Sequence, residues 1–88
     1  WDENKNRANR LKHGVSFELA QEVFDDPLAL SRLDRIAGSE QRWHTLGRVE
    51  GVLLLVSHTA FEHEGEEVIR IISARKATAH ERRQYEQD

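Results

Sequence analysis

The sequence predicts one α+β domain with two N-terminal helices, an antiparallel sheet of about four strands and a C-terminal helix. The hydrophobic pattern changes after Pro27 from the helical period to the alternation that is typical of strands. The connections between the alternating segments are too short to hold a crossover helix, so neighbouring strands must be antiparallel. A chain of 88 residues has room for one small core, so residues 1–88 are expected to form a single domain.

The two N-terminal helices are predicted from the residues at their ends. Asp2 is a good N-cap for a helix over about residues 3–12, and Gly14 stands where a left-handed C-cap residue is expected. The apolar stripe of this helix is thin, which predicts a position on the surface. Ser16 is the N-cap of a second helix. That helix must end before Pro27, because the proline ring holds the preceding residue in an extended conformation.

Four segments with the composition of strands follow, and then one helix. The strands are predicted at residues 28–33, 42–48, 52–59 and 68–75. Their connections are predicted as a loop at 36–41, a tight turn at 49–51 that contains Gly51, and an acidic turn at 60–67. Thr78 and Glu81 have the spacing of a capping box, so the last helix should begin there and run to about Glu86.

The composition excludes several classes of protein. The chain has no Cys, which excludes disulfides, thiolate metal sites and cysteine nucleophiles. The longest apolar run, from Val52 to Val56, is far shorter than the roughly 20 residues that span a bilayer. Because no signal-peptide pattern opens the chain either, we expect a cytoplasmic protein that does not contact a membrane. The chain begins at Trp1 and has no Met, so we expect its natural N-terminus, and with it a short first strand, to be missing.

Basic residues are segregated along the chain although its net charge is -3. Candidates to contact a phosphate are Arg42, His44 and Arg48 on the second predicted strand, Arg70, Arg75 and Lys76 on the last strand, and Arg82 and Arg83 on the final helix. Alternation predicts that the first three share one face of their strand. It also predicts that Arg70 and Lys76 share a face and that Arg75 points to the opposite one.

Such a basic site could cleave RNA without a metal ion or any other cofactor. RNA carries its own nucleophile, the 2'-hydroxyl group, so cleavage needs a base for that proton, cations for the charge on phosphorus and an acid for the 5'-oxygen. The planar arginine fork matches phosphate oxygens, and histidine or a lysine can transfer protons. Since DNA lacks the internal nucleophile, these residue types favour RNA as the substrate.

Plainer interpretations compete with this one. Arginine and lysine on exposed faces are more often solvated than bound to a ligand, and His44 alone is more often a packing residue. His58 at a predicted strand end suits catalysis but suits a structural hydrogen bond as well, and a zinc site from His58 and His63 would need further ligands. Trp43 could stack on a base, although a lone aromatic residue on a strand is more often core.

Three segments together resemble one protein family. They read "WDENKNRANRLKHGVSF", "RWHTLGR" and "IRIISARKATAHERRQYE", in this order and spacing, and they resemble the BrnT family of type II toxins. The resemblance implies a RelE-like fold and a ribonuclease that blocks translation. It also implies a ribbon-helix-helix antitoxin of the BrnA type, in a complex of two toxins with two antitoxins. The toxin would contact operator DNA only through this antitoxin.

The resemblance also directs attention to particular residues. The expected catalytic residues are Lys12, His13, Arg70 and Arg75, and the expected RNA-binding residues are Arg42, Arg48, Lys76, Arg82 and Arg83, with no metal ligand. Lys12 or His13 would transfer a proton, and the two catalytic arginines could contact one phosphate only if a bulge or the strand end turned one of them. The alternative hypothesis is a non-catalytic module that binds its antitoxin and assists operator repression.

Overall fold

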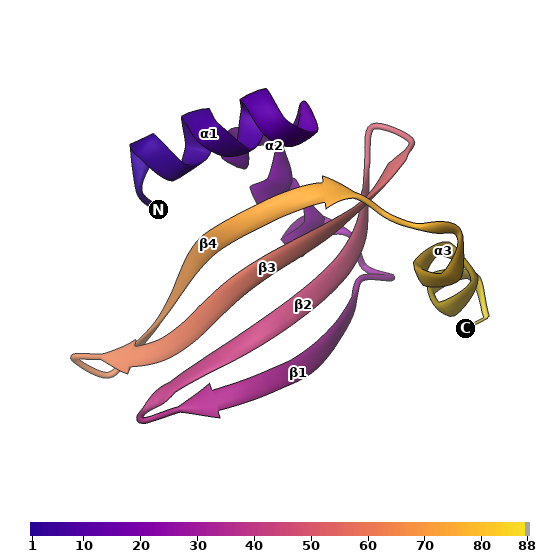
Figure 1. Ribbon diagram of the computed structural model, residues 1–88. Helices are drawn as coiled ribbons and strands as arrows, with labels where there is room; N and C mark the ends of the chain where they lie inside the picture. The colour runs from indigo at the N-terminus through magenta and orange to yellow at the C-terminus, as the bar shows by residue number, and fades with distance from the viewer. Residues whose placement is uncertain (88) are drawn as a thin grey trace.

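The protein forms one four-stranded antiparallel sheet with helices before and after it (Figure 1). This computed structural model describes residues 1–87, so the predicted domain extends one residue beyond them. The elements are α1 (Glu3–His13), α2 (Phe17–Ala20), the 3-10 helix η1 (Gln21–Asp25), β1 (Leu30–Ala37), β2 (Glu40–Val49), β3 (Val52–His63), β4 (Glu66–Lys76) and α3 (Ala79–Glu86). Neighbouring strands follow one another in the order β1-β2-β3-β4. The predicted α+β class is confirmed.

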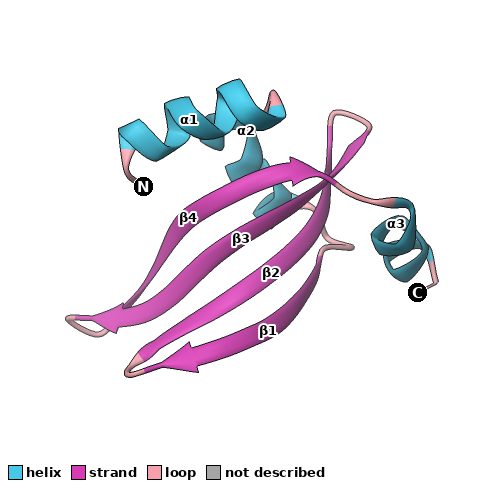
Figure 2. Ribbon diagram, viewed as in Figure 1, coloured by secondary structure: helices cyan, strands magenta, loops and turns pink. Residues whose placement is uncertain are grey.

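One face of the sheet packs against α1, α2 and η1, and we call it the helix side (Figure 2). The core between these layers consists of Val15, Phe17, Ala20 and Val23 from the helical segment and Val49, Leu54, Val56, Ile71 and Ala74 from the strands. The layers approach each other closely at Gly47 of β2, where an added Cβ would lie 2.7 Å from the Val23 Cβ. The helix side is therefore filled tightly around the middle of β2 and β3.

Helix α1 is held by buried asparagines and not by an apolar stripe. The Asn9 side chain is 7% exposed and bonds to the backbone of Ala74 in β4, donating to its carbonyl and accepting from its N–H. It also donates to the Val15 carbonyl, while the Asn6 carbonyl oxygen accepts from the Phe17 N–H. These bonds fix the C-terminal half of α1 against β4, which the sequence pattern did not predict.

The helix ends follow the predicted caps. The Asp2 side chain accepts from the first turn of α1, and Gly14 ends this helix with a φ of 72°. The second helical segment ends before Pro27 as predicted, although its last five residues form the tighter 3-10 helix η1. Both hydrogen bonds of the capping box between Thr78 and Glu81 are present at the start of α3.

The strands are longer than predicted, because the turns between them are shorter. The loop predicted at 36–41 is wrong, since β1 and β2 cover all of it except two residues. The acidic turn predicted at 60–67 is also too long, because Glu64 and Gly65 alone make that turn. Both have positive φ, as a two-residue hairpin turn requires, and the predicted turn at Gly51 has the same form. No helix among residues 1–87 has the length and apolar character to cross a membrane.

Candidate functional site

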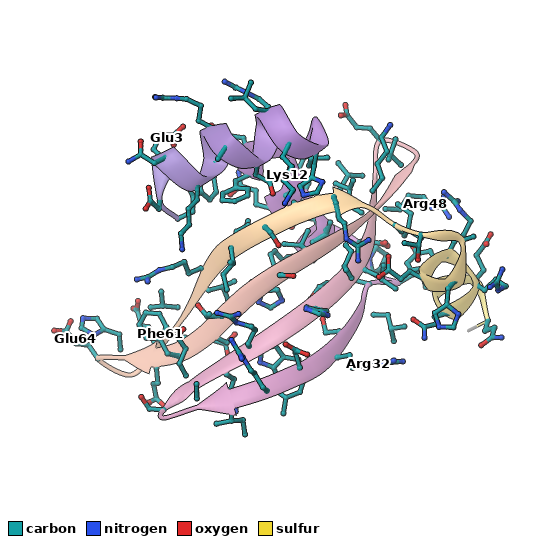
Figure 3. All side chains as sticks on the ribbon, in the orientation of Figure 1. Glu3, Lys12, Arg32, Arg48, Phe61 and Glu64 are labelled. Carbon is teal, nitrogen blue, oxygen red and sulfur yellow. The ribbon has the colours of Figure 1, made fainter. Side chains whose placement is uncertain are left out.

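The opposite face of the sheet is basic, and among the described residues α3 is the helix that packs on it, at one end. We call it the open face. Strand register places these side chains on it: Arg32 and Arg35 of β1, Arg42, His44 and Arg48 of β2, Ser57 and Thr59 of β3, and Arg70, Ser73 and Arg75 of β4. In Figure 3, Arg32 lies on the β1 edge and Arg48 beside α3. The sharing of one face by the three basic residues of β2 is as predicted.

Three arginines and a threonine form a line across the open face, which we call the arginine row. Arg35 pairs with Arg42, Arg42 with Thr59, and Thr59 with Arg70. Since strands lie about 4.8 Å apart, the backbone positions of this row span roughly 14 Å. The Thr59 hydroxyl is buried and has no hydrogen-bond partner among the described residues. A second row of Arg32, His44, Ser57 and Ser73 runs beside it.

None of the three arginines of the arginine row forms an ion pair with another of residues 1–87. Among residues 1–87, one arginine forms an ion pair, and it is Arg75. Arg70 is exposed, and its guanidinium carbon lies 5.9 Å from the centre of the Phe61 ring, where it is held by cation–π attraction. Arg42 is half-buried between its neighbours. Like-charged side chains in adjacent strands repel each other, so this arrangement suits a polyanionic ligand.

Two β-bulges bring the arginines of the edge strands to the open face. The register shifts by one residue at Asp34 in β1, so Arg32 and Arg35 point the same way although they are three apart. It shifts again at Ile72 in β4, so Arg70 and Arg75 both point to the open face. The predicted opposition of Arg70 and Arg75 is therefore wrong. Bulges add one residue to a strand and reverse the alternation after it, which is common on edge strands.

Lys76 was predicted to share a face with Arg70, and this is wrong for the same reason. Lys76 pairs with Leu54, a core residue of the helix side, so it projects to that side. Lys12 and His13 lie there too, at the end of α1 and one turn beyond Asn9, whose side chain bonds to β4. The four residues expected to be catalytic are thus divided, with Arg70 and Arg75 on the open face and Lys12 and His13 across the β4 edge.

Arg75 is bound to α3. Its two terminal nitrogens donate to the two carboxylate oxygens of Glu81 at 2.8 and 2.9 Å. This bidentate bond lowers the pKa of Glu81 to about 2, and it raises the pKa of Arg75 above its ordinary value. Glu81 also accepts from the Thr78 N–H at the helix start. Arg75 therefore fixes the first turn of α3 on the open face.

The other end of α3 is fixed by Tyr85. Its hydroxyl donates to Asp26 at 2.7 Å, and the Arg48 N–H donates to the same carboxylate oxygen at 2.8 Å. These bonds lower the pKa of Asp26, the first of them most, and the carboxylate in turn raises the pKa of Tyr85. The Arg48 guanidinium carbon lies 5.5 Å from the Tyr85 ring centre. Arg82 and Arg83 are exposed on α3, so they border the open face without belonging to it.

A cavity lies on the open face where α3 meets the sheet. Its volume is about 170 Å³. It is lined by Leu30, Arg32, His44, Leu46 and Leu55 from the strands and by His80, Glu81 and Gln84 from α3. The leucines give it an apolar floor, and the two histidines add imidazole groups to its walls.

His58 belongs to a different environment, in the middle of β3 on the helix side. Its Nε2 lies 2.8 Å from the Thr45 hydroxyl, which lies 2.8 Å from the Ser31 hydroxyl, and its ring packs edge-on against Phe24. Burial lowers its pKa below 6.5. Trp43 is half-buried on the same side, near β1. Among residues 1–87 no group of three or more His, Asp or Glu side chains could hold a metal ion.

Some residues of the open face were missed by sequence reasoning. Arg35 was missed because β1 was predicted to end at residue 33, and Arg32 lay inside that predicted strand but was not considered as a phosphate contact. Thr59 was regarded as the end of a strand that in fact continues to His63. His44 was placed on the basic face of its strand but was interpreted by itself as a packing residue, and the register places it between Arg32 of β1 and Ser57 of β3.

The family comparison agrees with the resemblance seen in the sequence. Residues 1–81 match the family described as ribonuclease toxin, BrnT, of type II toxin-antitoxin system. This stretch contains every strand of the sheet and the start of α3. No curated protein matches the chain.

Proposed function

Because the chain belongs to the BrnT family of ribonuclease toxins from type II toxin-antitoxin systems, we propose that it is a metal-independent endoribonuclease whose open face binds its RNA. The observation that carries this proposal is the arginine row, in which three arginines share the open face without an ion-pair partner among the described residues. An anionic strand laid across the row would replace their mutual repulsion by attraction.

Within this proposal the arginines have distinct tasks. Arg42 and Arg70 bind phosphate oxygens on the two sides of Thr59, and Arg70 lies closest to the scissile phosphate. Each planar fork can donate two hydrogen bonds to a phosphate and stabilise the charge that grows during attack by the 2'-oxygen. Arg75 contributes by fixing α3, and an RNA phosphate can compete with the Glu81 carboxylate for its fork. Arg48, Arg82 and Arg83 lie near the outer end of α3 and extend the attraction along the strand.

Lys12, His13 and Lys76 can contact the RNA only if it extends to the helix side. They lie on the helix side, so RNA must pass around the β4 edge to meet them and Arg70 together. Among the described residues β4 is an edge strand and α1 packs beside it at Ala74, so this path would run next to the C-terminal end of α1. Lys12 or His13 would then exchange a proton with the nucleotide next to the bound phosphate.

The partner that we propose is a BrnA-type ribbon-helix-helix antitoxin, in a complex of two toxins and two antitoxins. A type II toxin is neutralised by a protein antitoxin, and an acidic segment would complement the arginine row as RNA does. Operator DNA is contacted through this antitoxin. The free toxin acts in the cytoplasm, where cleavage of RNA stops translation and arrests growth.

The test of this proposal uses purified protein, a labelled RNA and an excess of EDTA. We expect the wild type to cleave the RNA in EDTA, and Arg42→Gln and Arg70→Gln to lower cleavage by about 10-fold or more through weaker binding and poorer charge stabilisation. Arg7→Gln is the matched control, because it removes the same charge from the exposed side of α1. Intact RNA with the wild type would favour the non-catalytic module, and equal loss in all three variants would refute the assignment of the open face.

A further inference from the structure

The proposed reaction needs proton transfer on the open face, and the arginine row cannot provide it. Guanidinium groups stay protonated in proteins, so they bind and neutralise phosphate but do not act as a base. The groups predicted for this task, Lys12 and His13, lie across the β4 edge from Arg70. A group that projects from the open face itself could reach the phosphate without the RNA passing around the β4 edge.

His44 has the position that this task requires. It stands in the second row of the open face, with Arg32 on one side and Ser57 on the other, and Arg42 of the arginine row is two residues away on the same strand. Along a strand this spacing is about 7 Å. The ring is half-buried and lines the cavity under α3. A phosphate bound to Arg42 on the side of His44 would therefore have an imidazole within reach.

A second imidazole faces the same cavity from α3. His80 lines it opposite the sheet residues, and its Nε2 lies 3.3 Å from the Gln84 amide nitrogen. Transfer of a phosphoryl group in line requires a base on the side of the attacking oxygen and an acid on the side of the leaving oxygen. Two histidines that line one cavity, one from the sheet and one from α3, can meet that requirement for a phosphate at the cavity, where Arg32 is a further lining residue.

We propose that His44 is a catalytic residue that transfers a proton during RNA cleavage, with His80 as its partner; this inference rests on the proposed function. One imidazole accepts the proton of the 2'-hydroxyl while the 2'-oxygen forms a bond to phosphorus. The bond from phosphorus to the 5'-oxygen breaks, and the other imidazole, in its protonated form, donates a proton to that oxygen. The products are a 2',3'-cyclic phosphate and a free 5'-hydroxyl, and solvent restores both protonation states.

The charges around His44 come from each element that packs near it. Arg32 faces it from β1, Arg42 lies along its own strand, and α3 contributes His80 and Glu81. The carboxylate of Glu81 is bound to Arg75, so that pair adds little net charge at the cavity. The ring of His58 lies on the other side of the sheet and also interacts electrostatically with His44.

The experiment compares His44→Gln with His63→Gln and His13→Gln. His63 is the matched control, because its side chain is 69% exposed at the acidic β3–β4 turn. Cleavage rates at saturating RNA would be measured from pH 5 to pH 9, together with RNA affinity and the thermal unfolding midpoint. We expect His44→Gln to lower the maximal rate by about 100-fold or more and to remove one limb of the pH profile, with RNA affinity within a few fold of wild type. We expect His63→Gln to match the wild type.

An RNA with sulfur in place of the scissile 5'-oxygen assigns the two roles, because a thiolate leaves without an acid. His44→Gln and His80→Gln would both be measured on this substrate. The variant that lacks the acid recovers its cleavage rate, and the variant that lacks the base does not. A folded His44→Gln that cleaves RNA at the wild-type rate would overturn the inference, as would His13→Gln abolishing the pH limb that His44→Gln retains. Failure of the wild type to cleave RNA would instead refute the proposed function.

Discussion

Replacement of Glu81 by Gln should detach the first turn of α3 from the sheet. In the wild type this carboxylate receives both terminal nitrogens of Arg75 and the Thr78 N–H. Glutamine keeps the shape and one acceptor oxygen but loses the charge, so one of the two arginine bonds is lost and the other is weakened. The substitution does not touch the arginine row, so its effect on folding can be measured apart from RNA binding.

The magnitude follows from the pKa of Glu81. Its decrease from 4.5 to about 2 corresponds to an upper limit of about 3 kcal/mol in the free energy of unfolding. The Arg75 side chain is 37% exposed and that of Glu81 is 18% exposed, so solvent screens part of the attraction. We therefore expect Glu81→Gln to lower the free energy of unfolding by about 1–2 kcal/mol, which would lower the unfolding midpoint by about 4–8 °C per kcal/mol.

The assay is urea unfolding of both proteins between pH 7 and pH 2. A carboxyl group whose pKa is lower in the folded state than in the unfolded state stabilises the fold above the unfolded value, and that contribution is lost as the pH falls through the folded value. The difference between wild type and Glu81→Gln should thus be constant above about pH 5 and should close as the pH falls from 4.5 towards 2. A difference that does not change with pH in this window would refute the assignment to the Arg75 pair.

Three further substitutions test the packing. Gly47→Ala should lower stability by about 1–3 kcal/mol in urea unfolding, because the new Cβ would lie 2.7 Å from the Val23 Cβ. Asn9→Ala should cost about 2–4 kcal/mol by the same measurement, since buried backbone groups of Ala74 lose their partners. His58 has a lowered pKa, so wild-type stability should decrease as the pH falls below about 6.5, and His58→Gln should show a smaller decrease between pH 7.5 and 5.5.

Local signals in the sequence were sufficient to predict the ends of the helices, but they did not predict contacts between residues far apart in the chain. The caps at Asp2, Gly14 and Thr78 act within one turn, so their residues alone predict where α1 and α3 begin or end. Asn9 shows the opposite case, because its partner Ala74 is 65 residues away and a buried asparagine has no periodic signature. The exact length of the strands also depended on pairing, since a polar segment becomes a strand when its neighbour offers hydrogen bonds.

In the candidate site, too, some positions could be predicted from the local pattern and others could not. Arg42, His44 and Arg48 lie on an unbroken strand, so alternation alone placed them correctly on one face. Arg70 and Arg75 lie on the two sides of the bulge at Ile72, and no local residue pattern marks that bulge. A single extra residue reverses every side chain beyond it, so the error at Lys76 and the error at Arg75 have one cause.

The bulge also allows Arg75 to bind α3 and to share a face with Arg70, which regular alternation would exclude. On a regular strand, an arginine that fixes α3 on the open face could not have Arg70 on the same face, five residues earlier. With the extra residue, Arg75 binds Glu81 and lies on the same face of β4 as Arg70. The position of α3, and with it the cavity that holds His44 and His80, therefore depends on the same backbone irregularity that brings the edge arginines to the open face.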